Sequence, residues 1–293
     1  MAARLSGTSG RYFAGKRCLV TGAASGIGRA TALRLAAQGA ELYLTDRNPD
    51  GLELTVADAR ALGARVPVHR TLDIADYDAV AAFGADIHAE HSSMDVVLNI
   101  AGVSAWGTVD RLTHEQWRKV VAINLMGPIH VIETFVPPMV AARRGGHVVN
   151  VSSAAGLVAL PWHAAYSASK YGLRGLSEVL RFDLASHRIG VSVVVPGAVK
   201  TPLVDTVEIA GVDREDPRVA RWVNRFSGYA VSPERAAEKM LAGVAKNRYL
   251  IYTSQDIQAL YAFKRLAWWP YSVVMRQVNV VFTRALRPTP VPR

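Results

Sequence analysis

Apolar runs and segments of helical periodicity alternate along most of this 293-residue chain. The apolar runs are short, rich in Val, Leu and Ile, and followed by Gly, Asp or Asn, which is typical of strands buried inside a parallel sheet. The segments between them repeat apolar residues every three or four positions, as helices packed on a sheet do. The pattern predicts seven strands, at 17–20, 41–46, 65–72, 94–99, 147–151, 191–195 and 248–252.

The predicted helices follow the strands in regular order. One begins in the turn after the first strand and stops at Gly39, and another carries Tyr166 and extends toward His187. Strands and helices that alternate in this way form a parallel sheet covered on both faces, with ligands at the carboxyl ends of the strands. We therefore expect an α/β protein with a single doubly wound, Rossmann-type domain. The remaining predicted helices cover 51–62, 76–91 and 113–142.

Composition agrees with one large globular domain. The residues are 50% hydrophobic and 20% charged, which supplies a sizeable core and is unlike a disordered chain. The single cysteine, Cys18, has no partner for a disulfide, so we expect a reducing compartment. The first fifteen residues lack the apolar segment of a secretory signal. These features favour a cytoplasmic protein.

The turn after the first predicted strand, residues 21–28, has the glycine-rich sequence TGAASGIG. Glycines there permit a tight turn and a close approach of the backbone to a pyrophosphate, and the following helix N-terminus attracts anions. The spacing of Gly22, Gly26 and Gly28 differs from the dinucleotide fingerprint GxGxxG, and many ordinary loops also need glycine. Because this turn joins a strand to a helix, it predicts nucleotide binding.

Tyr166 and Lys170 lie four residues apart and share one face of the helix predicted to carry them. A tyrosine hydroxyl titrates near ~10 in isolation, and a nearby cation favours its phenolate form. The pair could therefore exchange a proton with a bound ligand. A Tyr and a Lys at this spacing are also typical of a solvated helix face, so the pair alone does not decide the function.

Taken together, the motifs of the chain resemble those of the short-chain dehydrogenase/reductase family. The resemblance is to the shorter subtype, not the longer epimerase-like one, and covers about residues 13–252. Six motifs occur in the order and spacing of the family. They are Gly22, Gly26 and Gly28; Asn99-Ile100-Ala101-Gly102; Asn124; Ser153; Tyr166 with Lys170; and Pro196-Gly197.

The resemblance implies hydride transfer between a nicotinamide and a carbon that bears oxygen. Tyr166 would then donate a proton to the substrate oxygen or remove it, Lys170 would hold the nicotinamide ribose and favour the phenolate, and Ser153 would hydrogen-bond the same oxygen. Asn124 would hold a water that links Lys170 to solvent, since an amide in a helix interior is unfavourable unless bonded. Ser152 would face the other way on its strand and be structural.

Charge at the end of the second predicted strand bears on cofactor choice. There the Asp46 carboxylate could accept the ribose hydroxyls and would repel a 2′-phosphate, which favours NAD. NADP-preferring members of the family often carry Lys or Arg where this chain has Ser25. Arg47 is a complication, because it could bind a phosphate, although a solvated charge explains it as well. We expect NAD rather than NADP.

The resemblance implies further cofactor contacts. Asp73 would contact the adenine beside Ile74, while the backbone at Val199 and the hydroxyl of Thr201 would hold the carboxamide. Asp73 and Thr201 could instead cap the segments that follow them, and Pro196-Gly197 is also typical of a simple turn. The predicted cofactor residues are Gly22, Ser25, Gly26, Ile27, Gly28, Asp46, Arg47, Asp73, Ile74, Asn99, Ala101, Gly102, Tyr166, Lys170, Pro196, Gly197, Val199 and Thr201.

The predicted substrate pocket is roomy and apolar, which suits a steroid-like, lipid-like or other bulky secondary alcohol. In the family, a mobile lid would correspond to about residues 202–230. The pocket residues could equally belong to the core or to an interface, and His163 could contact substrate or merely begin the helix. We find no close pairing of the eight His with acids or Cys at ligand spacing, so a catalytic metal is not expected. The predicted lining is Trp106, Leu160, Trp162, His163, Leu203, Val204 and Val207.

The C-terminal part departs from the family. Residues 235–293 hold ten Lys or Arg against two acids, a net charge of +8, which leaves +2 for residues 1–234. Aromatics beside a basic amphipathic helix, expected from 270 to 287, suit an anionic membrane interface, although packing on the protein or on a sister subunit is equally compatible. No uncharged apolar run there reaches the ~20 residues of a membrane span. The expected stripes are Ser272, Arg276, Asn279, Thr283 and Arg287 (polar) and Val274, Val278, Val281 and Ala285 (apolar).

These observations divide the chain into an arm at 1–12, a dinucleotide-binding and catalytic domain at 13–255, and a basic extension at 256–293. The hypothesis is an NAD-dependent oxidoreductase that interconverts a bulky apolar secondary alcohol and its ketone. We expect a homodimer or homotetramer, with peripheral membrane contact through the extension as an option and no nucleic-acid partner. The alternatives are an NADP-dependent ketoreductase and a non-catalytic NAD-sensing or membrane-scaffold protein, against which the intact Ser, Tyr and Lys set argues.

Overall fold

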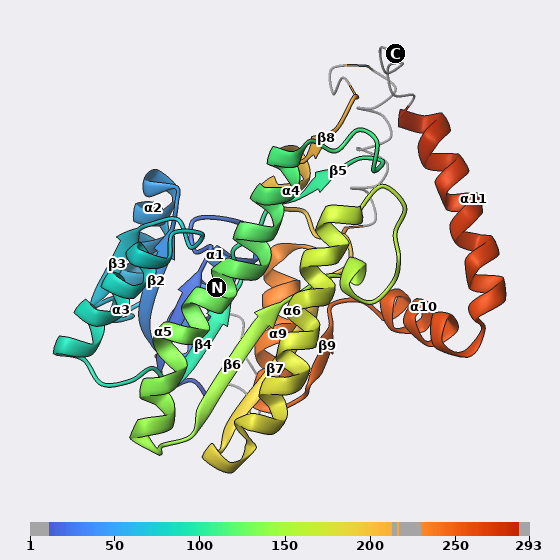
Figure 1. The fold of residues 1–293 in the computed structure, drawn as a ribbon. Coiled ribbons are helices and arrows are strands. Elements are labelled where there is room, and N and C mark those ends of the chain that lie inside the picture. The colour runs from blue at the N-terminus through green and yellow to red at the C-terminus, as the bar shows by residue number, and fades with distance from the viewer. Residues whose placement is uncertain (1–11, 213–215, 217–229, 287–293) are drawn as a thin grey trace, which may run out of the picture.

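A seven-stranded parallel sheet forms the centre of the molecule (Figure 1). The computed structural model describes residues 12–212, 216 and 230–286. The strand order is β3-β2-β1-β4-β6-β7-β9. The strands β2 and β3 are added on one side of β1 and the later ones, from β4 onward, on the other side. Sheets of this kind bind ligands at the switch point between β1 and β4. The predicted α/β, doubly wound fold is confirmed. The strands are β1 Arg17–Thr21, β2 Glu41–Asp46, β3 Val68–Thr71, β4 Val96–Asn99, β6 Gly146–Val151, β7 Ile189–Val195 and β9 Leu250–Tyr252.

Helices cover both faces of this sheet, and strand side chains alternate between them. On β1, Cys18 and Val20 pack under α1, α2 and α9, whereas Leu19 packs on the opposite face, against α3 and α5. Burial on both faces explains why the strands are nearly continuous apolar runs in the sequence. The helices are α1 Gly26–Ala36, α2 Pro49–Ala61 and α9 Pro233–Ala245 on one face, and α3 Tyr77–Glu90, α5 Gly127–Ala142 and α6 Ala164–Asp183 on the other.

The single helix predicted at 113–142 is wrong in detail. The structure divides it into α4 (His114–Val121), a π-helical segment η2 (Ala122–Met126) and α5. A π-helical turn inserts an extra residue into the helix, and here it contains Asn124, whose fully buried amide pairs with the backbone of Val103. A hydrogen bond from a distant segment therefore overrides the local helical pattern.

Several element boundaries also differ from the prediction. The strands β3 and β9 are shorter than 65–72 and 248–252, and α6 ends at Asp183, before a one-turn 3-10 helix. The left-handed backbone of Arg188, with φ of 58°, follows that turn. Short elements give little periodic signal, and these were not predicted: β5 Ala105–Trp106, β8 Glu208–Ile209, η3 Ala154–Gly156 and α7 Pro202–Asp205.

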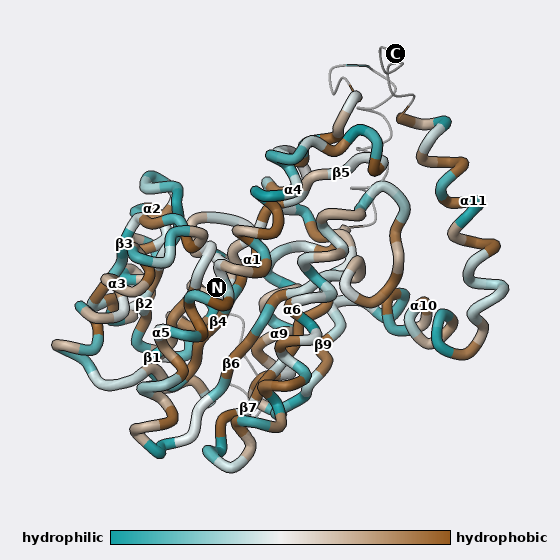
Figure 2. Tube along the Cα trace, in the orientation of Figure 1, coloured by the Kyte–Doolittle hydropathy of each residue, from teal (hydrophilic) through white to brown (hydrophobic). Residues whose placement is uncertain are grey.

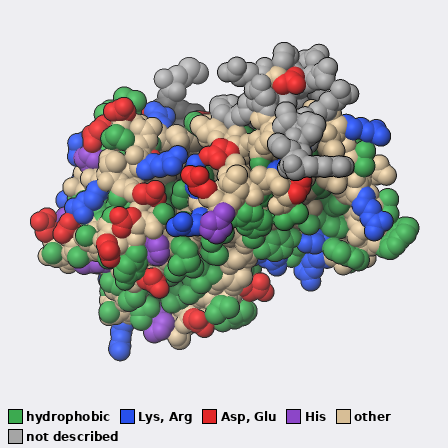
Figure 3. Space-filling model, turned by 45° about the horizontal axis from the view of Figure 1, so that its top comes forward, with side chains coloured by type: hydrophobic (Ala, Val, Ile, Leu, Met, Phe, Trp, Pro, Cys, Tyr) green, Lys and Arg blue, Asp and Glu red, His purple; other side chains and the backbone are tan. Residues whose placement is uncertain are grey.

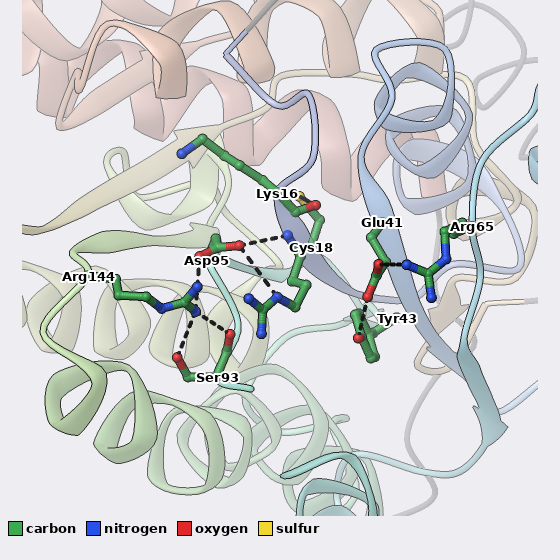
Figure 4. A network of polar contacts seen from close by, with 9 residues as sticks. Lys16, Cys18, Glu41, Tyr43, Arg65, Ser93, Asp95 and Arg144 are labelled. Carbon is green, nitrogen blue, oxygen red and sulfur yellow. Dashed lines mark hydrogen bonds and ion pairs between the residues drawn. The ribbon is translucent and has the colours of Figure 1, made fainter. Parts of the chain in front are cut away.

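A polar network closes the end of the sheet opposite the ligand-binding crevice (Figure 4). Asp95, just before β4, accepts a hydrogen bond from the backbone N–H of Arg17 at 2.9 Å and forms an ion pair with Arg144 at 3.2 Å. Glu41, at the start of β2, accepts the hydroxyl of Tyr43 at 2.6 Å. These groups join the amino ends of neighbouring strands, so we regard the network as structural.

Two helices follow the last strand and extend away from the sheet: α10 (Gln255–Leu266) and α11 (Trp268–Leu286) (Figure 1). The helix expected from about residue 270 is therefore present, and hydrophobic and hydrophilic residues alternate along it (Figure 2). Its buried side differs from the expected one. Tyr271 and Leu286 are buried, whereas Val274 and Val281 are 42% and 57% exposed.

Candidate active site

A cavity of about 930 Å³ opens at the carboxyl ends of the strands. The glycine-rich turn, the ends of β2, β4, β6 and β7, and the start of α6 line it, together with residues of α10. The turn and the end of β2 form one part, and α6 and α10 form another. We call these the dinucleotide part and the substrate part of the cavity.

The three glycines of the turn have no room for side chains. A Cβ on Gly22, whose φ is 71°, would lie 2.8 Å from the backbone of Ala101. A Cβ on Gly28 would overlap the carbonyl oxygen of Gly22, and one on Gly26 would come within 3.0 Å of Thr201. Bare backbone is thereby exposed at the start of α1, where N–H groups and the helix dipole attract an anion. This cradle fits the pyrophosphate of a dinucleotide.

Asp46 holds this turn against the end of β2. Its carboxylate accepts the backbone N–H groups of Ala24 and Asn48, each at 2.9 Å. A carboxylate has about four acceptor positions, so two stay available for hydroxyl donors in the cavity. Arg47 is exposed and lines the cavity, and it has no ion pair within the described residues.

Asp73 and Ile74 line the cavity after β3. The carboxylate of Asp73 accepts the N–H of Ala75 at 2.9 Å, whereas the N-cap of α3 is Asp76, which accepts the N–H of Ala79 at 3.0 Å. The interpretation of Asp73 as a helix cap is therefore wrong. The Asp73 carboxylate is exposed in the cavity, so an adenine could reach it there, and the predicted contact stays a prediction.

Tyr166 and Lys170 lie on the first turns of α6 and face the cavity. The Lys170 Nζ donates to the carbonyl of Val151 at 2.9 Å and lies 5.8 Å from the centre of the Tyr166 ring. Burial lowers the pKa of Lys170 to about 8. Burial also raises the pKa of Tyr166, while a hydrogen bond with Ser153 opposes that shift. The phenol is therefore protonated at neutral pH and can donate a proton.

The adjacent serines have different environments. Ser152 is buried, and its hydroxyl donates to the carbonyl of Lys170 at 2.9 Å. The Ser153 hydroxyl accepts the N–H of Ala155 at 3.1 Å and hydrogen-bonds Tyr166. Ser152 thus binds the backbone of α6, whereas Ser153 binds the Tyr166 hydroxyl. This difference is expected from the alternation of side chains along a strand.

Asn124 lies behind the cavity and does not line it. Its amide donates to the carbonyl of Val103 and accepts the N–H of the same residue, both at 2.8 Å. A Cβ on Gly102 would lie 3.1 Å from the Asn124 oxygen and 3.5 Å from the Lys170 nitrogen. Asn124 therefore holds the segment after β4 close to Lys170, and its predicted bond to a water stays a prediction.

The remaining predicted cofactor residues have mixed positions. Pro196, Gly197, Val199 and Thr201 line the cavity. Thr201 is the N-cap residue of α7, as one of the two interpretations expected, but its side chain makes no capping hydrogen bond. The Asn99 amide donates to Asn150 at 2.9 Å and does not reach the cavity. The lining also includes Ser25, Ile27, Ile74, Ala101 and Gly102.

The substrate part is lined by five of the seven residues predicted for it. Trp162 is not among them: it is 5% exposed, its φ is 67°, and it packs on Val207, Ile209 and Leu286 instead. The side chain of Val204 lies outside the described residues, as do 213–215 and 217–229 of the predicted lid. The lining predictions that agree are Trp106, Leu160, His163, Leu203 and Val207.

His163 is a neutral group in this lining. Burial lowers its pKa to about 4, and its ring lies 4.6 Å from that of Trp106 and 6.3 Å from that of Tyr166. The Nδ1 atom is 2.7 Å from the carbonyl of Pro161. Because a carbonyl only accepts, Nδ1 carries the proton, and Nε2 is left as an acceptor.

The C-terminal helices build part of this site, a contribution that was not predicted from the sequence. Ile257 and Leu260 of α10 line the cavity. The loop before α6 is held from outside, since Lys264 donates to the carbonyl of Leu157 at 2.8 Å and Ala159 donates its N–H to the Tyr271 hydroxyl at 2.7 Å. On α11, the Phe282 ring lies 6.2 Å from His163. The sequence does contain a pattern that indicates this packing, because the apolar residues at 271, 275, 278, 282 and 286 share one face of a helix.

Among residues 12–212, 216 and 230–286, no group of three or more His, Cys, Asp or Glu side chains could hold a metal ion. Independently of that, the described site brings Ser153, Tyr166 and Lys170 into one cavity with the glycine-rich turn.

Known proteins are similar to this chain in sequence and in fold. A family profile described as short chain dehydrogenase matches residues 16–210. The oxidoreductase SadH of Mycobacterium tuberculosis is 36% identical over 257 residues, which cover 87% of this chain and 91% of that protein.

Two solved structures are similar to the whole fold. A short-chain dehydrogenase/reductase from Burkholderia phymatum in complex with NAD has a TM-score of 0.79 at 27% identity, covering 96% of this chain and 98% of that one. A metagenomic short-chain oxidoreductase in complex with NADP has a TM-score of 0.65 at 30% identity, covering 82% and 96%. The two relatives thus hold different dinucleotides.

Proposed function

This chain belongs to the short-chain dehydrogenase family, and on that premise we propose that it is an NAD-dependent enzyme that interconverts a bulky apolar secondary alcohol and its ketone. The observation that carries the proposal is the convergence of Ser153, Tyr166 and Lys170 in one cavity with the bare glycine turn. A proton donor and an anion-binding cradle in the same cavity support coupled proton and hydride transfer.

A nicotinamide dinucleotide fits the dinucleotide part. Gly22, Gly26 and Gly28 would hold its pyrophosphate, Asp46 its ribose hydroxyls, and Val199 with Thr201 its carboxamide. When bound, the cofactor supplies or accepts the hydride. The observation behind this fit is the turn itself, where a Cβ on Gly22 or Gly28 would collide with backbone.

The residues of the chain handle the proton. In reduction, the protonated Tyr166 donates to the substrate oxygen, and Ser153 hydrogen-bonds the same oxygen and orients it. Lys170 keeps its position through the Val151 carbonyl, and its charge stabilises the phenolate that donation leaves behind. In oxidation the same groups act in reverse.

NAD is favoured over NADP by two positions. The Asp46 carboxylate would repel a 2′-phosphate, and Ser25 offers no positive charge at the second glycine. Arg47, which lines the cavity without an ion pair in the described part of the chain, favours an NADP-dependent ketoreductase as the second candidate. Titration calorimetry with NADH and NADPH separates the two, and tighter binding of NADPH would overturn the preference.

The substrate part supports a bulky apolar substrate. Val158, Leu160, Leu203 and Leu260 line it, and the Nε2 atom of His163 would accept a hydrogen bond from a second polar group on the substrate. A long or polycyclic ketone with one hydroxyl donor near the carbonyl fits this lining, because the rings of His163 and Tyr166 lie 6.3 Å apart.

Substitution of the proton donor tests the proposal. Tyr166→Phe should abolish turnover across a panel of alcohols and ketones while NADH binding persists, because the ring remains and only the hydroxyl is lost. Tyr77→Phe is the control, since that tyrosine is 50% exposed and lies outside the cavity. Retained turnover in Tyr166→Phe would contradict the assignment. NADH binding by a wild-type protein that turns over no substrate would favour a non-catalytic sensor or scaffold.

For the assembly, we propose a cytoplasmic homodimer or homotetramer acting on a small-molecule substrate. We also propose the division into an arm at 1–12, a catalytic domain at 13–255 with a lid at about 202–230, and an extension at 256–293. Light scattering of the purified protein gives the subunit number.

A further inference from the structure

The surface of the C-terminal helices is unusually apolar. Among the described residues, fourteen large hydrophobic side chains are exposed, and seven of them lie between positions 266 and 281. A soluble surface carries such side chains singly, whereas a contiguous group marks an interaction site. The seven are Leu266, Trp268, Trp269, Val273, Val274, Val280 and Val281.

Most of these side chains take no part in attaching α11 to the domain, although the Trp268 ring lies 5.7 Å from that of Tyr271. The inner face of the helix makes that contact: Tyr271 and Leu286 are 1% and 2% exposed, and Met275 and Phe282 pack beside them. At 100° per residue, Trp269, Val273 and Val280 project on the opposite face. Trp269 is 76% exposed there. The helix therefore has two apolar faces, and only the inner one packs on the domain.

The charge around the outer face has a single sign. No acidic residue occurs from 257 to 293, which contain six Lys or Arg. Arg276 and Arg284 are exposed on α11 and have no ion pair within residues 12–212, 216 and 230–286. Figure 3 shows hydrophobic and basic side chains together at the right-hand edge of the molecule, the side on which α11 lies in Figure 1.

We propose that the outer face of α11 docks on an anionic phospholipid surface, with the helix lying in the plane of the membrane. Exposed tryptophans favour the boundary between water and acyl chains, valines enter the acyl layer, and arginines at the edges attract lipid phosphates. A second copy is a poorer occupant, because two such helices side by side would bring cations together without a carboxylate from either one.

Docking differs from spanning. The one described stretch that is long and apolar enough to cross a bilayer is His114–Ala142, 56% of whose most apolar window is buried inside the fold. The α11 helix instead carries two exposed arginines and a buried inner face, which keeps it at the surface.

The location of the helix gives the docking a consequence. Its inner face holds the loop at 157–163 that walls the substrate part, through Tyr271 and Phe282. A docked helix would bring that wall next to the acyl layer, in which an apolar substrate concentrates. This consequence rests on the proposed function, whereas the docking itself does not.

Vesicle sedimentation of the full-length protein tests the docking. We expect co-sedimentation with phosphatidylcholine vesicles that contain about one-third phosphatidylglycerol, and much weaker co-sedimentation with phosphatidylcholine alone, because the cations need anionic lipid. The double variant Trp269→Glu/Val280→Glu should bind at least about tenfold more weakly, since it places charge in the inserted face. The double variant Arg276→Glu/Arg284→Glu should also bind anionic vesicles about tenfold more weakly, because it removes the cations that attract lipid phosphates. Added salt should weaken the binding of the wild type to the same vesicles.

Matched variants on other surfaces control for exposure and charge. Leu54→Glu/Val109→Glu alters two apolar residues that are 65% and 77% exposed elsewhere, and Arg118→Glu/Lys246→Glu makes the same change in net charge as the arginine pair. Both should bind like the wild type. All variants should keep the thermal midpoint and the NADH affinity of the wild type, which separates docking from folding and from catalysis.

Three results would overturn the docking. The wild type could stay in the supernatant with anionic vesicles at low salt. The α11 variants could bind as well as the wild type. The Trp269→Glu/Val280→Glu variant could have a lower molar mass by light scattering, which would assign the face to a second copy. None of these results bears on turnover of a soluble ketone, so the proposed function is tested separately.

Discussion

The two parts of the cavity are built in different ways. The pyrophosphate and ribose end of the dinucleotide part is built from short connections at strand ends, the turn at 21–28 and Asp46, which lie within 25 residues of each other in the chain. The substrate part combines segments that are far apart, so that Ala159 meets Tyr271 at a sequence separation of 112. A site made by local backbone geometry has little freedom to vary, whereas a site made by packing changes with any of the segments that meet there.

The largest expected effect tests whether one serine belongs to the chemistry and its neighbour to the scaffold. Ser153→Ala should lower kcat by about 10²–10³, because it removes a hydrogen bond to the reacting oxygen. Ser152→Ala should instead lower the free energy of unfolding by about 1 kcal/mol, because it removes the buried hydrogen bond that joins residue 152 to the Lys170 carbonyl of α6. Steady-state kinetics and urea unfolding of both variants measure the contrast, and equal kinetic losses would remove the distinction.

The next effect concerns the rigidity of the dinucleotide part. Gly28→Ala should weaken NADH binding about tenfold to a hundredfold, because its Cβ would overlap the Gly22 carbonyl and force the turn apart. NADH fluorescence titration measures the affinity. The control is Gly175→Ala on α6, where a Cβ meets nothing within 4 Å. If both variants bound NADH equally well, the cradle would be less constrained than described here.

A smaller effect is expected in the substrate part. Phe282→Ala should destabilise the fold by about 1–2 kcal/mol through lost apolar contact and should raise KM for a bulky ketone more than it lowers kcat, since His163 loses its outer neighbour. Phe282→Leu should recover most of the KM. Val281→Ala, at a position 57% exposed, is the control. An unchanged KM in Phe282→Ala would mean that α11 does not shape this part of the cavity.

The smallest effect follows from His163. Burial lowers its pKa to about 4 from the usual 6.5, so the unfolded chain binds more protons than the folded protein between these values, and stability falls as the pH drops through that window. Acidification from pH 7 to about 5.5 should cost about 1 kcal/mol through this group. Urea unfolding of His163→Gln should show a smaller loss than the wild type, whereas the exposed-site variant His114→Gln should behave like the wild type.

The dinucleotide part was largely predictable. Gly22 and Gly28 are needed because the backbone itself approaches Ala101 and the preceding turn, and such needs appear directly in the residue types. The same holds for the sheet, since burial on both faces of β1 and β4 produces apolar runs that a sequence displays.

Two of the errors lie where distant segments meet. Trp162 was expected in the substrate lining, but its left-handed backbone turns it toward Leu286, 124 residues later. The apolar stripe of α11 was assigned to Val274 and Val281, because the helix has two apolar faces and nothing in its own sequence says which one the domain covers.

The amino-acid sequence by itself determined the parallel sheet and the glycine turn, because these depend on backbone sterics and on apolar periodicity, whereas the Ser, Tyr and Lys set followed from the resemblance of the motifs to a known family. Tertiary structure decided the π-helical segment at Asn124, the orientation of Trp162 and the buried face of α11. In each of these cases a hydrogen bond or an apolar contact from a remote segment outweighs local preferences of only a few tenths of a kcal/mol to about 1 kcal/mol per residue, and such partners are known only once the chain has folded.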